Sequence, residues 1–262
     1  MAHKAFGSST GLTILAEDQA TPASGMVNYI TSSFQSGWQN GAIKGAFLSD
    51  TDDTDLVGSG ELVTNGTFDT DVSGWTDNSI GGSSISWNAS GYINLNVSAA
   101  SEAALADQSI TTVVGQTYVI SVAAINSVNS TAIFVGTSQG NNNLVSQGIG
   151  TAGSYSFTFT ATTTTTYIRL FSNNGGGGVA TASLDNVSVK LADADRSVNN
   201  NGLIVNGTVT RTAVATGADL VAYSGFSASN YLEQPYNSDL DFGTGDFCVM
   251  GWVNINSAEN FG

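Results

Sequence analysis

Charged residues are scarce in this chain of 262 residues: Asp, Glu, Lys and Arg make up 10% of it, against about 25% in an average soluble domain. Only six residues are Lys or Arg, they are spread along the sequence, and the formal net charge is −15. The lack of a basic patch argues against nucleic-acid binding and against attraction to an anionic membrane. An acidic surface suits a protein that binds neutral sugars or calcium, and it equally suits plain solubility.

Side chains for catalysis are scarce as well. The single cysteine, Cys248, excludes a disulfide framework and a cysteine zinc site, and the single histidine, His3, excludes a Ser-His-Asp arrangement in the folded part. No acid stands in an apolar strand that would raise its pKa. The candidates all sit in turn-like contexts: Asp71, Asp77, Asp107, Asp219, Asp239, Asp241 and Asp246. We expect no enzymatic activity and no catalytic residue.

Long apolar runs are absent. The start, MAHKAFGSSTGL, lacks the apolar core of a signal peptide, and no run reaches the ~18 apolar residues of a membrane-spanning helix. Helix-favouring residues are few, whereas Thr, Val, Asn, Ser and Gly are abundant. Thr and Val fit pleated strands and Asn and Gly fit turns, so the composition predicts an all-β fold without membrane insertion.

The pattern divides the chain into three parts. From 59 to 191, strand-like runs recur at intervals of roughly ten to twelve residues, which is typical of an antiparallel β-sandwich. In YSFTFTA, for example, Tyr155, Phe157 and Phe159 alternate with Ser and Thr and should share one face. Residues 192–262 are β-patterned to the last residue and end without closing a fold.

Residues 1–58 are too short and Gly-rich to hold a core alone. The spacing of Met26, Ile30 and Phe34 allows a short helix around 24–36, although the Thr and two Ser residues at 31–33 disfavour it. The aromatic residues need something to pack on, so we interpret the segment as an anchor that docks on other proteins. Its anchoring residues would be Tyr29, Phe34, Trp38 and Phe47; the alternative is a disordered leader.

The stretch SDTDDTD (49–55) offers carboxylates, as a calcium loop does. An EF-hand needs Gly at its sixth position, and counting from Asp50 that position holds Asp55. We expect a solvated acidic linker here.

The head and tail of the central part carry a family resemblance. ELVTNGTFDTDVSGWT (61–76) and SLDNVSV (183–189) resemble the first and last strands of calcium-binding carbohydrate-binding modules of the galactose-binding-like, jelly-roll kind. The resemblance implies a structural calcium held by Asp69 and Asp185; two turn carboxylates without metal are the alternative. It implies that Trp75 packs at the core edge. Trp87 and Tyr92 are the better candidates for a sugar platform, with core or edge packing as the alternative for each.

The last part has a resemblance of its own. YSGFSASNYLEQPYNSDLDFGTGDFCVMGWVNI (223–255) resembles the first half of a laminin-G/concanavalin A-like domain, which implies a partial second, lectin-like β-sandwich and a natural protein that continues further.

An anchor followed by two such sandwiches is similar to phage tail fibres and head fibres. The resemblance implies a virion structural protein, assembled in the host cytoplasm and attached to other virion proteins through residues 1–58. It would present sandwiches that bind host-surface polysaccharide. We expect a homo-oligomer, and among oligomeric states we expect a homotrimer. The alternatives are a bacterial surface or secreted glycan-binding protein without a signal peptide, and a polysaccharide-active enzyme whose catalytic domain lies beyond residue 262.

Overall fold

The computed structural model contains no α-helix among the residues that it describes. Described in full are residues 48, 52–128, 130–195, 201–214, 221–236, 240–241 and 243–246, and four strands between residues 5 and 39 are described by their backbone. Within this part of the chain, no helix has the length and hydropathy that a membrane crossing requires. The all-β prediction is confirmed.

The N-terminal strands form an antiparallel sheet in the order β1–β2–β3–β4. They are β1 (Ala5–Ser9), β2 (Leu12–Leu15), β3 (Met26–Thr31) and β4 (Phe34–Gln39). The short helix allowed by Met26, Ile30 and Phe34 is wrong, because these residues belong to β3 and β4. Residues four positions apart lie on the same face of a strand as well as on the same face of a helix, so the spacing alone does not separate the two. The β-branched residues Val27 and Thr31 favour the strand.

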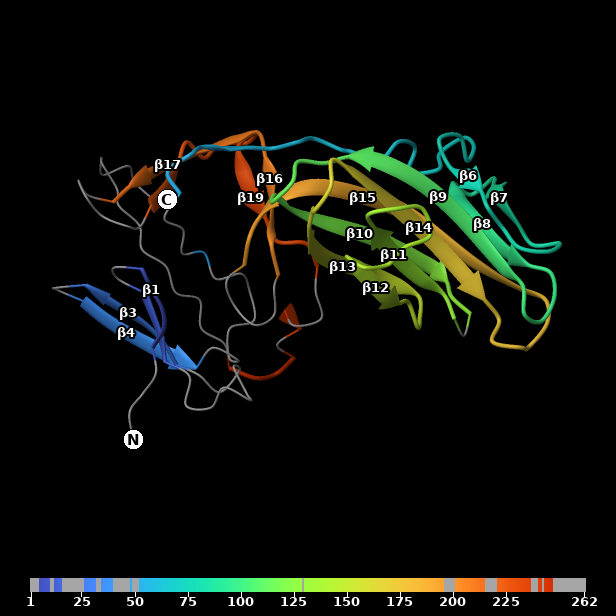
Figure 1. The fold of residues 1–262 in the computed structure, drawn as a ribbon, viewed down its shortest axis with the longest axis horizontal. Helices are drawn as coiled ribbons and strands as arrows, with labels where there is room; N and C mark the ends of the chain where they lie inside the picture. Colours follow the sequence, from blue (N-terminus) through green and yellow to red (C-terminus); the bar gives the residue numbers. More distant parts are fainter. Residues whose placement is uncertain are drawn as a thin grey trace.

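The central part of the chain is an antiparallel β-sandwich (Figure 1). The sandwich portion of its first sheet has the order β13–β10–β15–β8–β7, and β16 and β19 extend this sheet at one end. Its strands are β7 (Ser84–Asn88), β8 (Tyr92–Val97), β10 (Thr117–Asn126), β13 (Gly153–Thr160) and β15 (Ala180–Asp193).

The second sheet has the order β12–β11–β14–β9–β6. Its strands are β6 (Thr76–Asp77), β9 (Ala103–Thr111), β11 (Ala132–Gly136), β12 (Val145–Gly148) and β14 (Thr165–Asn173). Neighbouring strands within it are antiparallel throughout.

The inner faces of the two sheets enclose one apolar core. Its fully buried side chains include Phe68, Ile93, Leu95, Ile120, Ile133, Ile168, Leu170 and Leu184. Burying each such side chain stabilises the fold by about 1.5–3 kcal/mol. The predicted row of Tyr155, Phe157 and Phe159 does face this core, while the Ser and Thr residues between them face outward.

The head and the tail of the sandwich lie side by side. Leu62 N donates to Val189 O at 3.0 Å, and Val187 N donates to Gly66 O at 2.9 Å. The Glu61 carboxylate also accepts a hydrogen bond from Val189 N at 2.9 Å. These contacts tie the first residues of the sandwich to its last strand.

A smaller C-terminal unit continues from β15. Its strands are β16 (Leu203–Asn206), β17 (Thr208–Ala213), β18 (Val221–Ser224) and β19 (Tyr231–Glu233). β16 pairs with the end of β15 and with β19, and β17 pairs with β18. The Gly-Trp-Val stretch at 251–253 lies outside the described residues, so a second sandwich stays a prediction.

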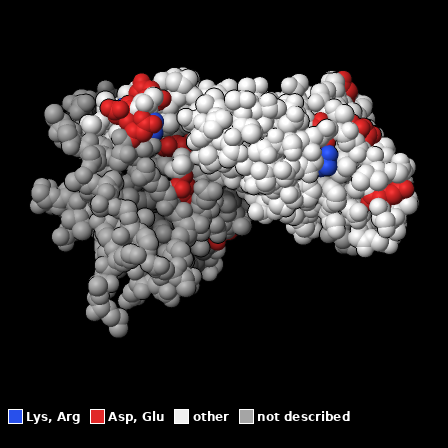
Figure 2. Space-filling model, viewed as in Figure 1, with Lys and Arg blue, Asp and Glu red and all other residues white. Residues whose placement is uncertain are grey.

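Residues 52–55 of the acidic stretch are exposed to solvent, as predicted, and they also make hydrogen bonds to this C-terminal unit. β5 (Leu56–Val57) pairs with β17, and Leu56 is buried with Val205 and Val209. Arg211 Nε donates to Thr54 O at 2.6 Å, and Arg211 Nη2 lies 3.1 Å from an Asp52 oxygen. Figure 2 shows acidic side chains gathered around a basic one at this end, while the viewed face of the sandwich is mostly uncharged.

Candidate functional site

The outer face of the second sheet carries a row of aromatic side chains. In β14, Tyr167, Arg169 and Phe171 point outward and are partly exposed, whereas the residues between them are buried. Phe134 of β11 pairs with Arg169 in the register, so it stands on the same outer face. We call Phe134, Tyr167, Arg169 and Phe171 the aromatic face.

Two of these rings border a shallow hollow. The Phe134 and Phe171 ring centroids are 5.3 Å apart with planes tilted by 45°. The hollow has a volume of about 460 Å³, and small residues such as Ala132, Gly148 and Gly150 form the rest of its wall. Small neighbours leave both rings accessible from the outside.

A fixed ion pair stands beside the rings. Arg169 Nε and Nη2 each donate to one oxygen of Asp107 at 2.6 Å. Asn78 Nδ2 and Gln139 Nε2 add hydrogen bonds to Asp107 at 2.8 and 3.2 Å. Hydrogen bonding and the charge of Asp107 raise the pKa of Arg169, although burial opposes the shift. The pair is therefore bidentate and carries no net charge.

The loop between β11 and β12 covers the guanidinium group. Gly140 has a φ of +80°, and a Cβ added to it would lie 2.9 Å from Arg169 Nη1. Glycine is required here both by the left-handed backbone and by this close approach. The loop and the ion pair thus fix one another.

Such a surface is suited to bind a flat, uncharged, hydroxylated ligand. Aromatic rings offer faces for the C–H groups of a sugar, and amide side chains such as that of Gln139 offer hydrogen bonds to its hydroxyls. Both oxygens of Asp107 are already engaged, so this buried carboxylate serves to hold Arg169.

The two predicted sugar-platform residues lie on opposite faces of the β7–β8 hairpin. In the register Trp87 pairs with Ile93 and Tyr92 pairs with Asn88, and adjacent pairs alternate between faces. Trp87 is 39% exposed, and its Nε1 donates to Phe68 O at 2.7 Å. The two rings therefore do not form one platform, and each stays a separate prediction. Trp75 packs in the core, as predicted.

The predicted metal ligands are close enough to interact. Burial raises the pKa of Asp185, the Asn186 backbone N–H lowers it, and the charge of Asp69 raises it further. Thr67 Oγ1 donates to Asp69 Oδ2 at 2.9 Å. Asn65, Phe68 and Asn186, which flank these acids, have left-handed φ values of 48–51°.

Two hard oxygen donors that repel each other fit calcium. The fit is partial, because the described residues contain no group of three or more His, Cys, Asp or Glu that would hold a metal. Backbone carbonyls and water would have to complete the six to eight ligands that calcium takes.

Three of the predicted anchoring residues lie in the N-terminal sheet. Tyr29 is in β3, and Phe34 and Trp38 are in β4. The register pairs Tyr29 with Ser36, Thr31 with Phe34 and Val27 with Trp38, which places the three aromatic positions on one face of the hairpin. Phe47 lies outside the described residues.

The aromatic face was not predicted from the sequence, and the prediction that Asp107 lies in a turn is wrong: Asp107 lies within β9 and is 4% exposed. Its charge is tolerated there because Arg169 is its cross-strand partner. The signal was the run TYIRLFSN, where Tyr167, Arg169 and Phe171 recur at intervals of two.

The fold defines the central part as an antiparallel β-sandwich of the jelly-roll type. Among solved structures, the chain is similar to CBM4, with 19% identity, coverage of 49% of this chain and 99% of that chain, and a TM-score of 0.40. It is similar to TmCBM61 in complex with β-1,4-galactotriose, with 15% identity, coverage of 50% and 98%, and a TM-score of 0.37.

It is also similar to the enzymatically active domain of tailspike protein 4 of bacteriophage CBA120, with 17% identity, coverage of 50% of this chain and 21% of that chain, and a TM-score of 0.38. No protein-family model matches the chain, and no curated protein matches it.

Replacing Arg169 by Met should destabilise the sandwich by about 3 kcal/mol, because it leaves the Asp107 carboxylate buried without its charge partner. The double variant Arg169→Met/Asp107→Leu should recover most of this loss. Urea denaturation of both proteins measures the difference. If the single and double variants lose the same free energy of unfolding, Arg169 does not stabilise the sandwich through its ion pair with Asp107.

Proposed function

We propose that the sandwich binds a neutral glycan on its aromatic face. The observation that carries the proposal is the row of partly exposed rings at Phe134, Tyr167 and Phe171 on an otherwise small and polar sheet surface. Neighbouring exposed rings are typical of a surface that binds a ligand or partner, and pyranose C–H groups stack on such rings.

The charge pattern favours an uncharged ligand. Arg169 is the one basic side chain on the aromatic face, and Asp107 neutralises it through two hydrogen bonds. An anionic polysaccharide would meet the field of a protein with a net charge of −15 and no free cation on this face to compensate.

We further infer that the protein is a virion structural protein, a fibre or capsid appendage that is anchored by its N-terminal sheet and presents the sandwich to a host-surface glycan. The support is the order of parts: a separate small sheet with three aromatic positions on one hairpin face precedes a sandwich with a ligand-type surface. A bacterial surface or secreted glycan-binding protein would share the sandwich and its ligand but would not need that sheet to assemble.

The double variant Phe134→Ala/Phe171→Ala should lose binding to neutral polysaccharides, because each stacked ring contributes about tenfold in affinity. Affinity electrophoresis against glucans, galactans, mannans and xylans measures the retardation of wild type and variant. The matched control is Trp87→Ala and Tyr92→Ala, made separately. Retardation lost in a control but kept in the double variant would move the site to the β7–β8 hairpin, and no retardation by any polysaccharide would refute glycan binding.

We propose in addition that Asp69 and Asp185 share a calcium ion that joins the two ends of the sandwich. In chelator, Asp69→Asn should be at least as stable as wild type, because the substitution removes the repulsion between the carboxylates. On adding calcium, wild type should gain in melting temperature and Asp69→Asn should not. Asp71→Asn, a nearby acid outside the pair, is the control. A wild-type melting temperature that is independent of calcium would sink the site.

Removal of residues 1–51 should leave the rest folded while abolishing assembly into the particle, if the N-terminal sheet is the anchor. The cut is placed before Asp52 because Leu56 and Val57 pair with β17. Far-UV circular dichroism checks the fold, and incorporation into purified particles checks assembly. Normal incorporation of the truncated chain would rule out the anchor. A second truncation, to residue 58, should lower stability because it removes β5.

A further inference from the structure

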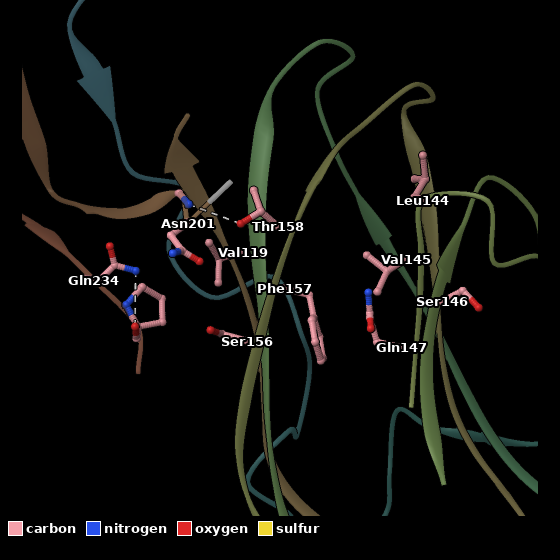
Figure 3. Close-up of a pocket in the computed structure, with 12 residues that line it drawn as sticks. Val119, Leu144, Val145, Ser146, Gln147, Ser156, Phe157, Thr158, Asn201 and Gln234 are labelled. Atoms are coloured by element: carbon pink, nitrogen blue, oxygen red, sulfur yellow. Dashed lines mark hydrogen bonds between the residues drawn. The ribbon is translucent and has the colours of Figure 1, made fainter. Parts of the chain in front are cut away.

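A second cavity lies where the sandwich meets the C-terminal unit, and it is separate from the aromatic face (Figure 3). It has a volume of about 300 Å³, at the small end of the range for ligand pockets. The open edges of the two sheets meet here: β12 and β13 are edge strands, and both contribute to the wall. We call this cavity the edge pocket.

Uncharged polar groups dominate its wall. The sandwich contributes Gln147 from β12 and Ser156 and Phe157 from β13, and the C-terminal unit contributes Gln234 and Pro235. Among the described residues that line the pocket, none is ionisable as an acid or base. The pocket therefore offers hydrogen bonds and two apolar ring surfaces, without a charge to hold a phosphate, carboxylate or ammonium group.

Contacts between the two units hold the walls in place. Ser156 Oγ donates to Tyr236 O at 2.9 Å, and Gly202 N donates to Thr158 Oγ1 at 3.3 Å. In addition, β15 pairs directly with β16. The pocket is thus already formed by hydrogen-bonded backbone on both sides.

Gln234 has an unpaired acceptor in this wall. Its Nε2 donates to Pro235 O at 3.4 Å, whereas its Oε1 is buried and accepts no hydrogen bond within the described part of the chain. Exchanging the two amide atoms would set oxygen against the Pro235 carbonyl, so the observed orientation is the favourable one. A buried acceptor without a donor is costly, and a bound hydroxyl group would supply the missing donor.

We propose that the edge pocket binds one neutral sugar unit, with Gln234 Oε1 accepting a hydrogen bond from a ring hydroxyl and the Pro235 ring lying against the sugar's C–H groups. The unit is either a free monosaccharide or the end residue of a glycan chain, because both present the same hydroxyls. The site does not depend on the aromatic face. Binding here would bridge the sandwich and the C-terminal unit.

The test is saturation-transfer difference NMR on the whole chain with D-glucose, D-galactose and D-mannose, each titrated to about 50 mM, where a millimolar ligand saturates its site. We expect transfer to at least one sugar. Gln234→Met keeps the size of the side chain but removes the acceptor, and it should weaken that binding about tenfold. Gln147 is an exposed residue of the pocket wall, and in Gln147→Trp the larger side chain should block sugar binding sterically. Each measurement is made in the Phe134→Ala/Phe171→Ala background, which removes the aromatic face, so the binding that remains belongs to the edge pocket.

The outcomes separate this site from the proposed polysaccharide site. No saturation transfer from any of the three sugars overturns the proposal and leaves a water as the partner of Gln234. Binding that survives both Gln234→Met and Gln147→Trp in that background, or that is already absent from the Phe134→Ala/Phe171→Ala variant itself, also overturns it. If the methyl glycoside of the bound sugar binds equally well, a chain end fits the pocket; if only the free sugar binds, the ligand is a monosaccharide.

Discussion

The backbone of β15 holds both parts of the structure together. Along one edge it pairs with β10, and along the other it meets β8, then the segment at 62–66, and finally β16. The strand thus closes the sandwich and continues, without a break, into the C-terminal unit. At its end, Asp193 is 5% exposed and accepts a hydrogen bond from the Tyr223 hydroxyl at 2.7 Å. A hydrogen-bonded continuation of this kind leaves less freedom between the units than a flexible linker would.

The rigid sheet explains how a chain with so little charge keeps one ordered polar site. Arg169 and Asp107 are cross-strand neighbours on β14 and β9, so the register itself brings the guanidinium and carboxylate groups together. Little side-chain entropy remains to be lost when a ligand arrives. The ring of Phe171 on β14 and the ring of Phe134 on the neighbouring β11 are held by the same sheet and are preorganised in the same way.

The sequence predicted the sandwich because its signals are local. Alternation at Tyr155, Phe157 and Phe159 sets the inner face, and the head and tail motifs mark segments that do lie side by side, although the head residues 61–75 form no strand. The aromatic face was missed because it depends on register: Phe134 and Arg169 are far apart in sequence and meet only when β11 pairs with β14. Trp87 and Tyr92 were predicted to share a platform because they are close in sequence. Proximity in sequence does not tell on which face of a hairpin a ring lies.

The acidic stretch at 52–57 shows that sequence boundaries and structural units differ here. Leu56 belongs to the small core with Val205 and Val209, so the sandwich is inserted between two segments of one C-terminal unit. An insertion requires that the inserted domain begin and end close together. The hydrogen bonds between Leu62 and Val189, and between Gly58 and Gly207, satisfy that requirement. The chain enters and leaves the sandwich at the same end, and the sandwich extends away from the C-terminal unit, as Figure 1 shows.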